Sequence, residues 1–174
     1  MHILLIVLGI IAVLAVVVAM RPPEFRITRT ATIPAPTSRV FEHVNDLHKW
    51  QAWSPWAKLD PAARNTFEGP VYGTGAVFRW AGNNKVGEGS MAITESRENE
   101  FIRFTLDFLK PFRATNTAEF VFVSEGNQTK VTWSMFGKNS FMGKAVNLVM
   151  NCDKMVGGQF EQGLANLKVL TRQP

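Results

Sequence analysis

Apolar residues form one continuous run near the start of the chain, Ile3–Met20, in which the small residues are Gly and Ala. Thirteen of its 18 residues are Leu, Ile or Val, and as a helix the run would be about 27 Å long, close to the hydrocarbon thickness of a bilayer. This pattern predicts a transmembrane anchor at residues 1–21. A cleaved signal peptide is the alternative, because Val17–Ala19 is a tolerable cleavage site, although no Lys or Arg precedes the run and it is longer than signal sequences usually are.

Charged residues beside this run predict its orientation. Arg21, Arg26 and Arg29 follow it, whereas only His2 and the terminal amine precede it. Because Lys and Arg concentrate on the cytoplasmic side of a membrane, we expect a single-pass protein of the inner (cytoplasmic) membrane. Its folded domain, residues 22–174, would then lie in the cytoplasm.

Beyond the anchor, apolar and polar positions alternate in short segments separated by Gly, Pro and Asn. Such alternation indicates strands with one covered face and one exposed face. A short helix carrying Val40, Phe41 and Val44 at helical spacing interrupts the series after the first strand. The predicted strands are Phe25–Ile33, Ala76–Trp80, Val86–Glu95, Phe101–Phe108, Ala114–Val123 and Thr129–Phe136.

The C-terminal region changes to helical periodicity, with apolar residues three or four apart from Phe141 to Leu167. This spacing predicts one long helix, or two consecutive ones, that covers the sheet. Gly157, Gly158 and Gly163 fall inside the pattern and each costs about 1 kcal/mol of helix propensity. Either the helix backbone comes close to the sheet there, or space is kept open beneath it. The predicted fold is therefore α+β, a curved antiparallel sheet wrapped around a long C-terminal helix.

Composition narrows the possible chemistry. A net charge of +5 spread along the chain argues against nucleic acid as a partner. With Cys152 as the one cysteine, no internal disulfide or cysteine-based metal site can form, and we expect it to be a small buried residue on a helix. His43 and His48 are five residues apart, which does not suit one helical face, so neither a metal nor another cofactor is predicted.

Catalytic motifs are equally sparse. Glu42 and Asp46 flank His43 at helical spacing, but a polar outer face of a short helix explains them. The sequence contains no nucleophile elbow, phosphate-binding loop or dinucleotide fingerprint. We therefore assign no catalytic residue, and whether the protein is an enzyme stays open, with a non-enzymatic role favoured.

Several local motifs, taken in order, carry a family resemblance over roughly residues 25–170. They are Ile33–Pro36 before Val40-Phe41, Val44–Asp46 with Trp50, Trp53–Trp56, Gly69-Pro70, Gly73, Gly75, Trp80–Asn83, Gly87–Met91, Val131–Trp133 and Met155–Gly158 leading to Phe160, Gly163 and Leu164. The chain resembles the START-like superfamily (SRPBCC, or polyketide cyclase/dehydrase-like proteins, related to the Bet v 1-like birch-pollen allergen), and especially a bacterial subgroup with an N-terminal membrane helix. The resemblance implies a helix-grip fold with a cavity for a hydrophobic ligand, but no particular reaction.

The inner face of that fold supplies candidate cavity residues, for which ordinary core packing is the alternative. They are Trp80, Met91, Ile93, Phe104, Leu106, Phe120, Trp133 and Met135 on the sheet, closed by Met155, Phe160, Gly163 and Leu164 on the helix. Trp50, Trp53 and Trp56 would line the cavity mouth or meet the membrane interface, unless they simply pack on the sheet. Arg79, Glu88, Arg103 and Asp107 are the polar groups that could orient a ligand.

Three functions follow from this pattern. The first is membrane-tethered binding of a lipid or other hydrophobic small molecule in an internal cavity. The second is a polyketide cyclase/dehydrase-like enzyme acting in the same cavity, and the third is a ligand-free domain that interacts with an unidentified protein partner. An empty apolar hollow of about 300 Å³ would cost roughly 7 kcal/mol, so we expect an interior that is either packed or occupied.

Overall fold

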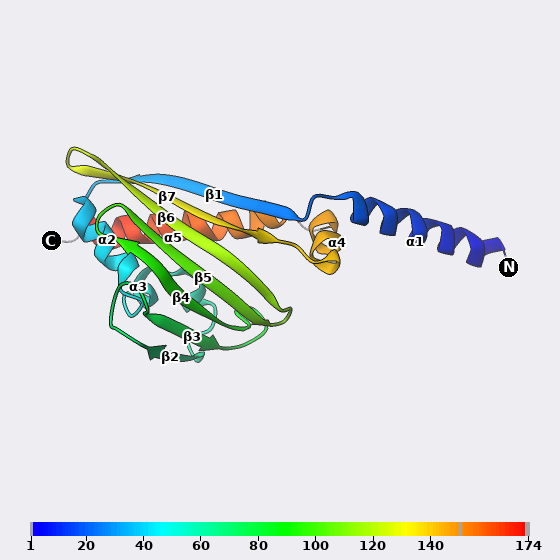
Figure 1. Ribbon diagram of the computed structural model, residues 1–174, viewed down its shortest axis with the longest axis horizontal. Coiled ribbons are helices and arrows are strands. Elements are labelled where there is room, and N and C mark those ends of the chain that lie inside the picture. Colours follow the sequence, from blue (N-terminus) through cyan, green and yellow to red (C-terminus); the bar gives the residue numbers. More distant parts are fainter. Residues whose placement is uncertain (1, 150, 173–174) are drawn as a thin grey trace.

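The computed structural model describes residues 2–149 and 151–172, so Met1, Met150 and residues 173–174 of the predicted segments lie outside it (Figure 1). Seven strands form one antiparallel sheet in the order β1-β7-β6-β5-β4-β3-β2. In chain order the elements are α1 (His2–Met20), β1 (Glu24–Ile33), α2 (Thr37–Asn45), α3 (Trp50–Trp53), the 3-10 helix η1 (Pro55–Lys58), β2 (Arg64–Glu68), β3 (Val77–Ala81), β4 (Glu88–Arg97), β5 (Phe101–Lys110), β6 (Ala114–Glu125), β7 (Gln128–Lys138), α4 (Phe141–Val149) and α5 (Cys152–Arg172).

The long helix α5 lies along the inner face of this curved sheet and packs against β1, as Figure 1 shows. Alternation along each strand supplies the apolar face that α5 covers. On β7, for example, Val131, Trp133 and Met135 are buried while Lys130 is exposed. The predicted α+β architecture is confirmed. Seven strands agree with the expectation of one strand followed by five or six more. The segment not delimited in advance is β2, a short edge strand with mainly exposed side chains and no apolar alternation.

The C-terminal region forms two consecutive helices, α4 and α5, which confirms the second of the two predicted alternatives. The shorter one, α4, packs mainly against α1 rather than on the sheet. Lys144 Nζ of α4 donates hydrogen bonds to the backbone oxygens of Ala19 and Arg21, at 3.1 and 3.0 Å. A cation is favourable there because the last carbonyl groups of a helix carry partial negative charge.

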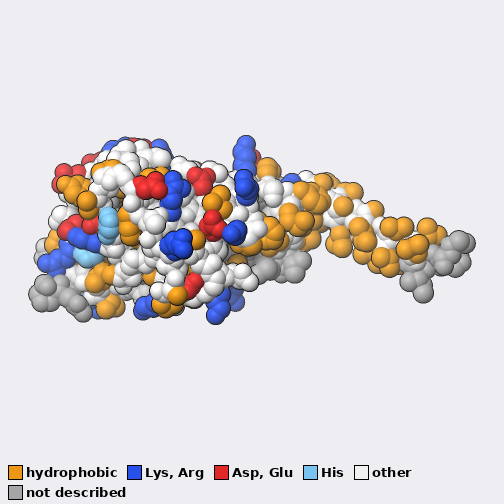
Figure 2. All heavy atoms as spheres, turned by 90° about the horizontal axis from the view of Figure 1, so that it is seen from below, with side chains coloured by type: hydrophobic (Ala, Val, Ile, Leu, Met, Phe, Trp, Pro, Cys, Tyr) orange, Lys and Arg blue, Asp and Glu red, His pale blue; other side chains and the backbone are white. Residues whose placement is uncertain are grey.

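α1 extends away from the sheet and is apolar on the face shown in Figure 2. Most of its Leu, Ile and Val side chains are exposed, whereas Val18 at its C-terminal end is buried. Among residues 2–149 and 151–172, none of the helices combines the length and the apolar character needed to cross a membrane. The predicted transmembrane anchor is therefore not supported by the structure.

Candidate functional site

Aromatic side chains fill the half of the interior that lies under α5. Trp133 stacks on Phe160 with ring centroids 4.0 Å apart and on Phe120 at 4.7 Å. Trp50 and Trp53 pack edge-on against the same ring of Trp133. Their indole nitrogens donate to the backbone oxygens of α2, at 2.8 and 3.0 Å. We call this the closed half.

The tryptophans predicted at a cavity mouth are mostly inside this core. Trp50 is 5% exposed and Trp53 is 0% exposed, so neither lies at an opening or at a membrane interface. Trp56 is half-buried and makes edge contacts with Trp133 and Phe160. The alternative prediction, that they pack on the sheet, describes Trp50 and Trp53 correctly.

Two of the helical glycines bring α5 close to its neighbours. A Cβ added at Gly163 would lie 2.9 Å from Cζ3 of Trp133 and 3.2 Å from Cδ of Pro55. A Cβ at Gly157 would collide with the guanidinium of Arg29, which bonds to Asp153 and Glu161 of α5. These glycines therefore permit close packing and do not keep a cavity open beneath the helix.

The other half of the inner face extends beyond the start of α5. Arg29 on β1 is opposite Trp133 on β7 and lies level with Gly157 of the helix. From there the inner face continues four residues to Phe25, which is roughly 14 Å. The helix continues only five residues to Cys152, roughly 8 Å. The sheet is thus longer than its cover at the end that faces α1.

Apolar side chains at this uncovered end are only half-buried. Leu106 and Phe108 of β5 share the inner face with Phe104, which is fully buried further along the strand. Trp80 packs edge-on against Phe108 at 6.0 Å and donates from Nε1 to the Val86 oxygen at 3.1 Å. We call the half-buried residues Phe25, Trp80, Leu106 and Phe108, together with Gly137 and Asn116, the open end.

Asn116 is the polar side chain of the open end. It is 8% exposed, and its Oδ1 is buried without a hydrogen-bond partner among the described residues. The amide fills the space that a side chain at Gly137 would occupy, and the ring of Phe25 lies beside the same space. An unpartnered buried carbonyl oxygen costs about 1–3 kcal/mol. The site therefore combines an apolar lining with one unused acceptor.

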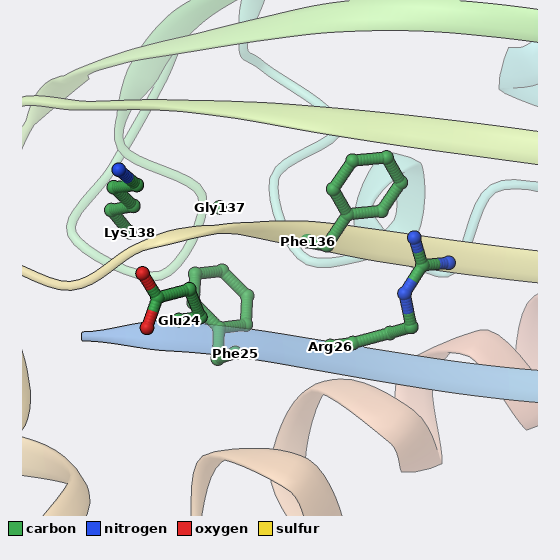
Figure 3. A pocket seen from close by; sticks show the side chains of 6 residues that line it. All are labelled: Glu24, Phe25, Arg26, Phe136, Gly137 and Lys138. Carbon is green, nitrogen blue, oxygen red and sulfur yellow. The ribbon is translucent and has the colours of Figure 1, made fainter. Parts of the chain in front are cut away.

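A groove of about 460 Å³ lies at the same strand ends. Figure 3 shows the six residues that line it: Glu24, Phe25, Arg26, Phe136, Gly137 and Lys138. Arg26 and Phe136 alternate with the buried Ile27 and Met135, so they project from the outer face. The Arg26 guanidinium lies 4.0 Å from the centre of the Phe136 ring, and the groove is an open surface feature.

The polar groups predicted to orient a ligand form ion pairs and hydrogen bonds instead. Arg79 and Arg103 alternate with inward residues and therefore project from the outer face. Arg79 pairs with Glu68 at 2.8 Å and lowers the pKa of that carboxyl by hydrogen bonding and charge. The remaining pairs are Arg103 with Glu95 and Glu119, Glu88 with Lys110, and Asp107 with Thr115.

The residues considered for acid–base chemistry lie apart from the interior. His43 Nδ1 is 2.8 Å from the Arg39 oxygen, and His48 stacks on Phe67 with ring centroids 4.0 Å apart. Glu42 is paired with Lys49, whose hydrogen bond and charge lower the pKa of the Glu42 carboxyl. His48 and Phe67 also border a small depression of about 140 Å³. These contacts give His43, His48 and Glu42 a structural role that requires no reaction.

The structure divides the predicted cavity residues into three groups. Most are core of the closed half and its neighbourhood: Met91, Ile93, Phe104, Phe120, Trp133, Met135, Phe160, Gly163 and Leu164. Trp80 and Leu106 form the second group and belong to the open end. Met155, which was predicted to close the cavity, forms the third: it is 51% exposed because it projects from the first turn of α5 away from the core. Phe25, Phe108 and Asn116 were not among the cavity residues predicted from the sequence. Asn116 could have been noticed, because it is a polar residue on the inner, mainly apolar face of β6.

Comparisons with known proteins agree with this geometry at the level of the fold. Protein Ms6760 from Mycobacterium smegmatis is 19% identical, with a TM-score of 0.58, over 83% of this chain and 89% of that one. Protein MLL2253 from Mesorhizobium loti is 12% identical, with a TM-score of 0.63, over 86% and 99% of the two chains. Ara h 8.0201 is 14% identical, with a TM-score of 0.55, over 83% and 97%.

A family model provides the assignment that such distant structural likeness does not. No curated protein matches the chain. Residues 24–171, which run from the first residue of β1 into the last turn of α5, match the model described as "Polyketide cyclase / dehydrase and lipid transport". The chain therefore belongs to the polyketide cyclase/dehydrase and lipid transport family.

Proposed function

We propose that the domain binds an apolar small molecule or a lipid at the open end of its inner face. The observation that carries this proposal is the difference in length between the sheet and its cover, which leaves Phe25, Leu106 and Phe108 half-buried beside a buried acceptor. The family description, which includes lipid transport, supports the same class of ligand. The role proposed is binding, and no reaction is assigned, because the described acid–base candidates are engaged elsewhere.

The binding step would be driven by removing apolar surface from water, worth about 25 cal/mol per Å². A guest lying on Leu106 and Phe108 would also complete the cover that α5 leaves unfinished. Because Trp80 lines the same end, it would be among the tryptophans that transfer energy to a fluorescent ligand bound there. The expected ligand is an elongated apolar molecule, part of which remains outside the protein.

Filling the open end tests this function directly. In the full chain held in lipid nanodiscs, we expect Leu106→Trp to weaken binding of a fluorescent fatty acid about tenfold or more, because the new ring occupies the site. Val123→Trp is the matched control, since Val123 is 48% exposed on the neighbouring strand β6 and projects from the outer face. Titration by energy transfer from tryptophan measures both. Equal affinity in the two variants, or no binding by the unaltered protein, contradicts the proposal.

We also propose that α1 attaches the domain to a bilayer. Its support is the exposed aliphatic surface of α1 and the exposed Phe141 and Met142 on the adjoining α4. Arg21 and Arg26 beside α1 favour the cytoplasmic face of the cytoplasmic membrane. The open end would then lie near the lipid from which an apolar ligand partitions.

Membrane attachment is measured by fractionating cells that express the full chain. We expect Ile10→Asp with Leu14→Asp to move most of the protein from the membrane pellet to the supernatant, because a charge at the centre of an inserted helix costs about 3 kcal/mol. Val121→Asp with Val123→Asp, on the exposed face of β6, is the control. Membrane association that survives the first pair of substitutions overturns this part of the proposal.

A further inference from the structure

We infer that Asn116 is the polar recognition residue of the open end and that its Oδ1 accepts a hydrogen bond from a hydroxyl group of the apolar guest. This inference rests on the function proposed above and adds the chemistry of the ligand: an apolar body that ends in a hydrogen-bond donor.

The residues beside Asn116 on the sheet explain why its Oδ1 has no hydrogen-bond partner in the described part of the chain. The cross-strand residues are Leu106 on β5 and Gly137 on β7, and the next inner-face residues along β6 are Ala114 and Ala118. None of these side chains carries a donor. The side chains beside Asn116 on the sheet therefore offer its Oδ1 no hydrogen-bond donor.

The glycine opposite Asn116 preserves this arrangement. Any side chain at position 137 would collide with Oδ1 of Asn116, and its Cβ would lie 3.3 Å from Cε1 of Phe25. The absence of a side chain at Gly137 therefore leaves the space that the amide of Asn116 occupies, beside the ring of Phe25. The acceptor is fixed on a strand, which positions it more precisely than a loop would.

The other buried unpartnered polar atom, Trp133 Nε1, is in a different situation. Its ring is stacked between Phe160 at 4.0 Å and Phe120 at 4.7 Å, with Trp50 and Trp53 against its edges. An indole N–H among aromatic rings can be partly satisfied by their π faces. Asn116 Oδ1 is also buried, but it lies beside Phe25 and Leu106, which are only half-buried. Asn116 rather than Trp133 is therefore the group next to which a guest at the open end would lie.

Two probes that differ only in their donor test the inference. We use 1-dodecanol and dodecyl methyl ether as competitors of the fluorescent fatty acid on the full chain in nanodiscs. The alcohol can donate to Oδ1, whereas the ether can only accept. We expect the unaltered protein to bind the alcohol about fivefold more tightly, which is the usual net value of one hydrogen bond.

Variants at position 116 locate the preference. Asn116→Leu should bind the two probes with equal affinity while keeping the affinity for the ether, and Asn116→Asp, which retains an acceptor, should keep the preference for the alcohol. Thr117→Val, the neighbouring position on the outer face, is the control. Thermal melting identifies any variant that fails to fold. For Asn116→Leu we expect a melting temperature equal to or above that of the unaltered protein, because leucine removes an unsatisfied buried group.

The outcomes separate this inference from the function on which it rests. Equal binding of both probes by the unaltered protein overturns the role of Asn116 and leaves apolar binding at the open end intact. A preference that persists in Asn116→Leu also overturns it. Failure of both probes and of the fatty acid to bind instead contradicts the proposed function itself.

Discussion

The closed half and the open end of the inner face are built from similar residues and differ in what covers them. Phe104 and Phe108 show this on one strand: both face α5's side of the sheet, yet Phe104 is fully buried and Phe108 is half-buried. In the closed half, α3, η1 and α5 all contribute aromatic side chains that contact Trp133 of the sheet. At the open end α5 has not yet begun, and α4 turns toward α1. The difference therefore arises from where the helices start, not from the composition of the sheet.

The same contrast explains how one face can serve both stability and binding. Aromatic rings in contact, such as Trp133 and Phe160, stabilise the fold by burial and by ring–ring contacts worth about 0.5–1.5 kcal/mol per pair. A guest would have to displace such contacts to enter the closed half. At the open end it would only replace water, so the two roles occupy different parts of one continuous apolar surface.

The largest effect should come from truncating one aromatic residue in each half. Phe104→Ala is expected to lower the free energy of unfolding by about 3–5 kcal/mol, the usual cost of deleting a buried Phe. Phe108→Ala should cost about half of that or less, because its side chain is already partly exposed, and should weaken binding of the fluorescent fatty acid. Urea unfolding of both variants measures the difference. Equal losses of stability would show that the two halves are covered alike.

A smaller effect is expected from two neighbouring glycines of α5. Gly163→Ala places a Cβ against Trp133 and Pro55 and should destabilise the domain by about 1–2 kcal/mol, since overpacking exceeds the gain in helix propensity. Gly158→Ala is the matched control, because a Cβ at Gly158 meets nothing within 4 Å. It should stabilise the domain by up to about 1 kcal/mol. In both thermal and urea unfolding, the midpoints of the two variants should therefore shift in opposite directions. A stabilising Gly163→Ala would contradict close packing at that point.

The sequence predicts the strands well because apolar alternation depends only on which face is covered. Phe104, Phe120, Trp133 and Leu164 were correctly placed on the inner surfaces for this reason. The pattern does not reveal how far the cover extends, since the break between α4 and α5 falls in the continuous apolar spacing from Phe141 to Leu167. A cavity and a core consequently have the same sequence signature.

Other site features depend on contacts between segments far apart in the chain. Gly157 is needed because Arg29, on another element, passes beneath it, and no local pattern records that contact. Gly137 is likewise explained by Asn116 on the adjacent strand. Met155 was predicted to close the cavity, but its side chain is 51% exposed, because the apolar spacing does not specify which side of the first turn of α5 meets the sheet.

The smallest effect should appear at Cys152, where the covered half begins. Partial burial raises the pKa of the Cys152 thiol, so less of it is thiolate at a given pH. We expect iodoacetamide to alkylate the folded protein more slowly than the urea-unfolded chain at pH 8, with a rate that rises at higher pH than for a free cysteine. Mass spectrometry of the timed reaction measures both rates. Since the first residue of α5 borders the open end, a bound fatty acid should slow alkylation of Cys152 further. Equal alkylation rates in the folded and the unfolded chain would mean that the start of α5 does not cover the thiol.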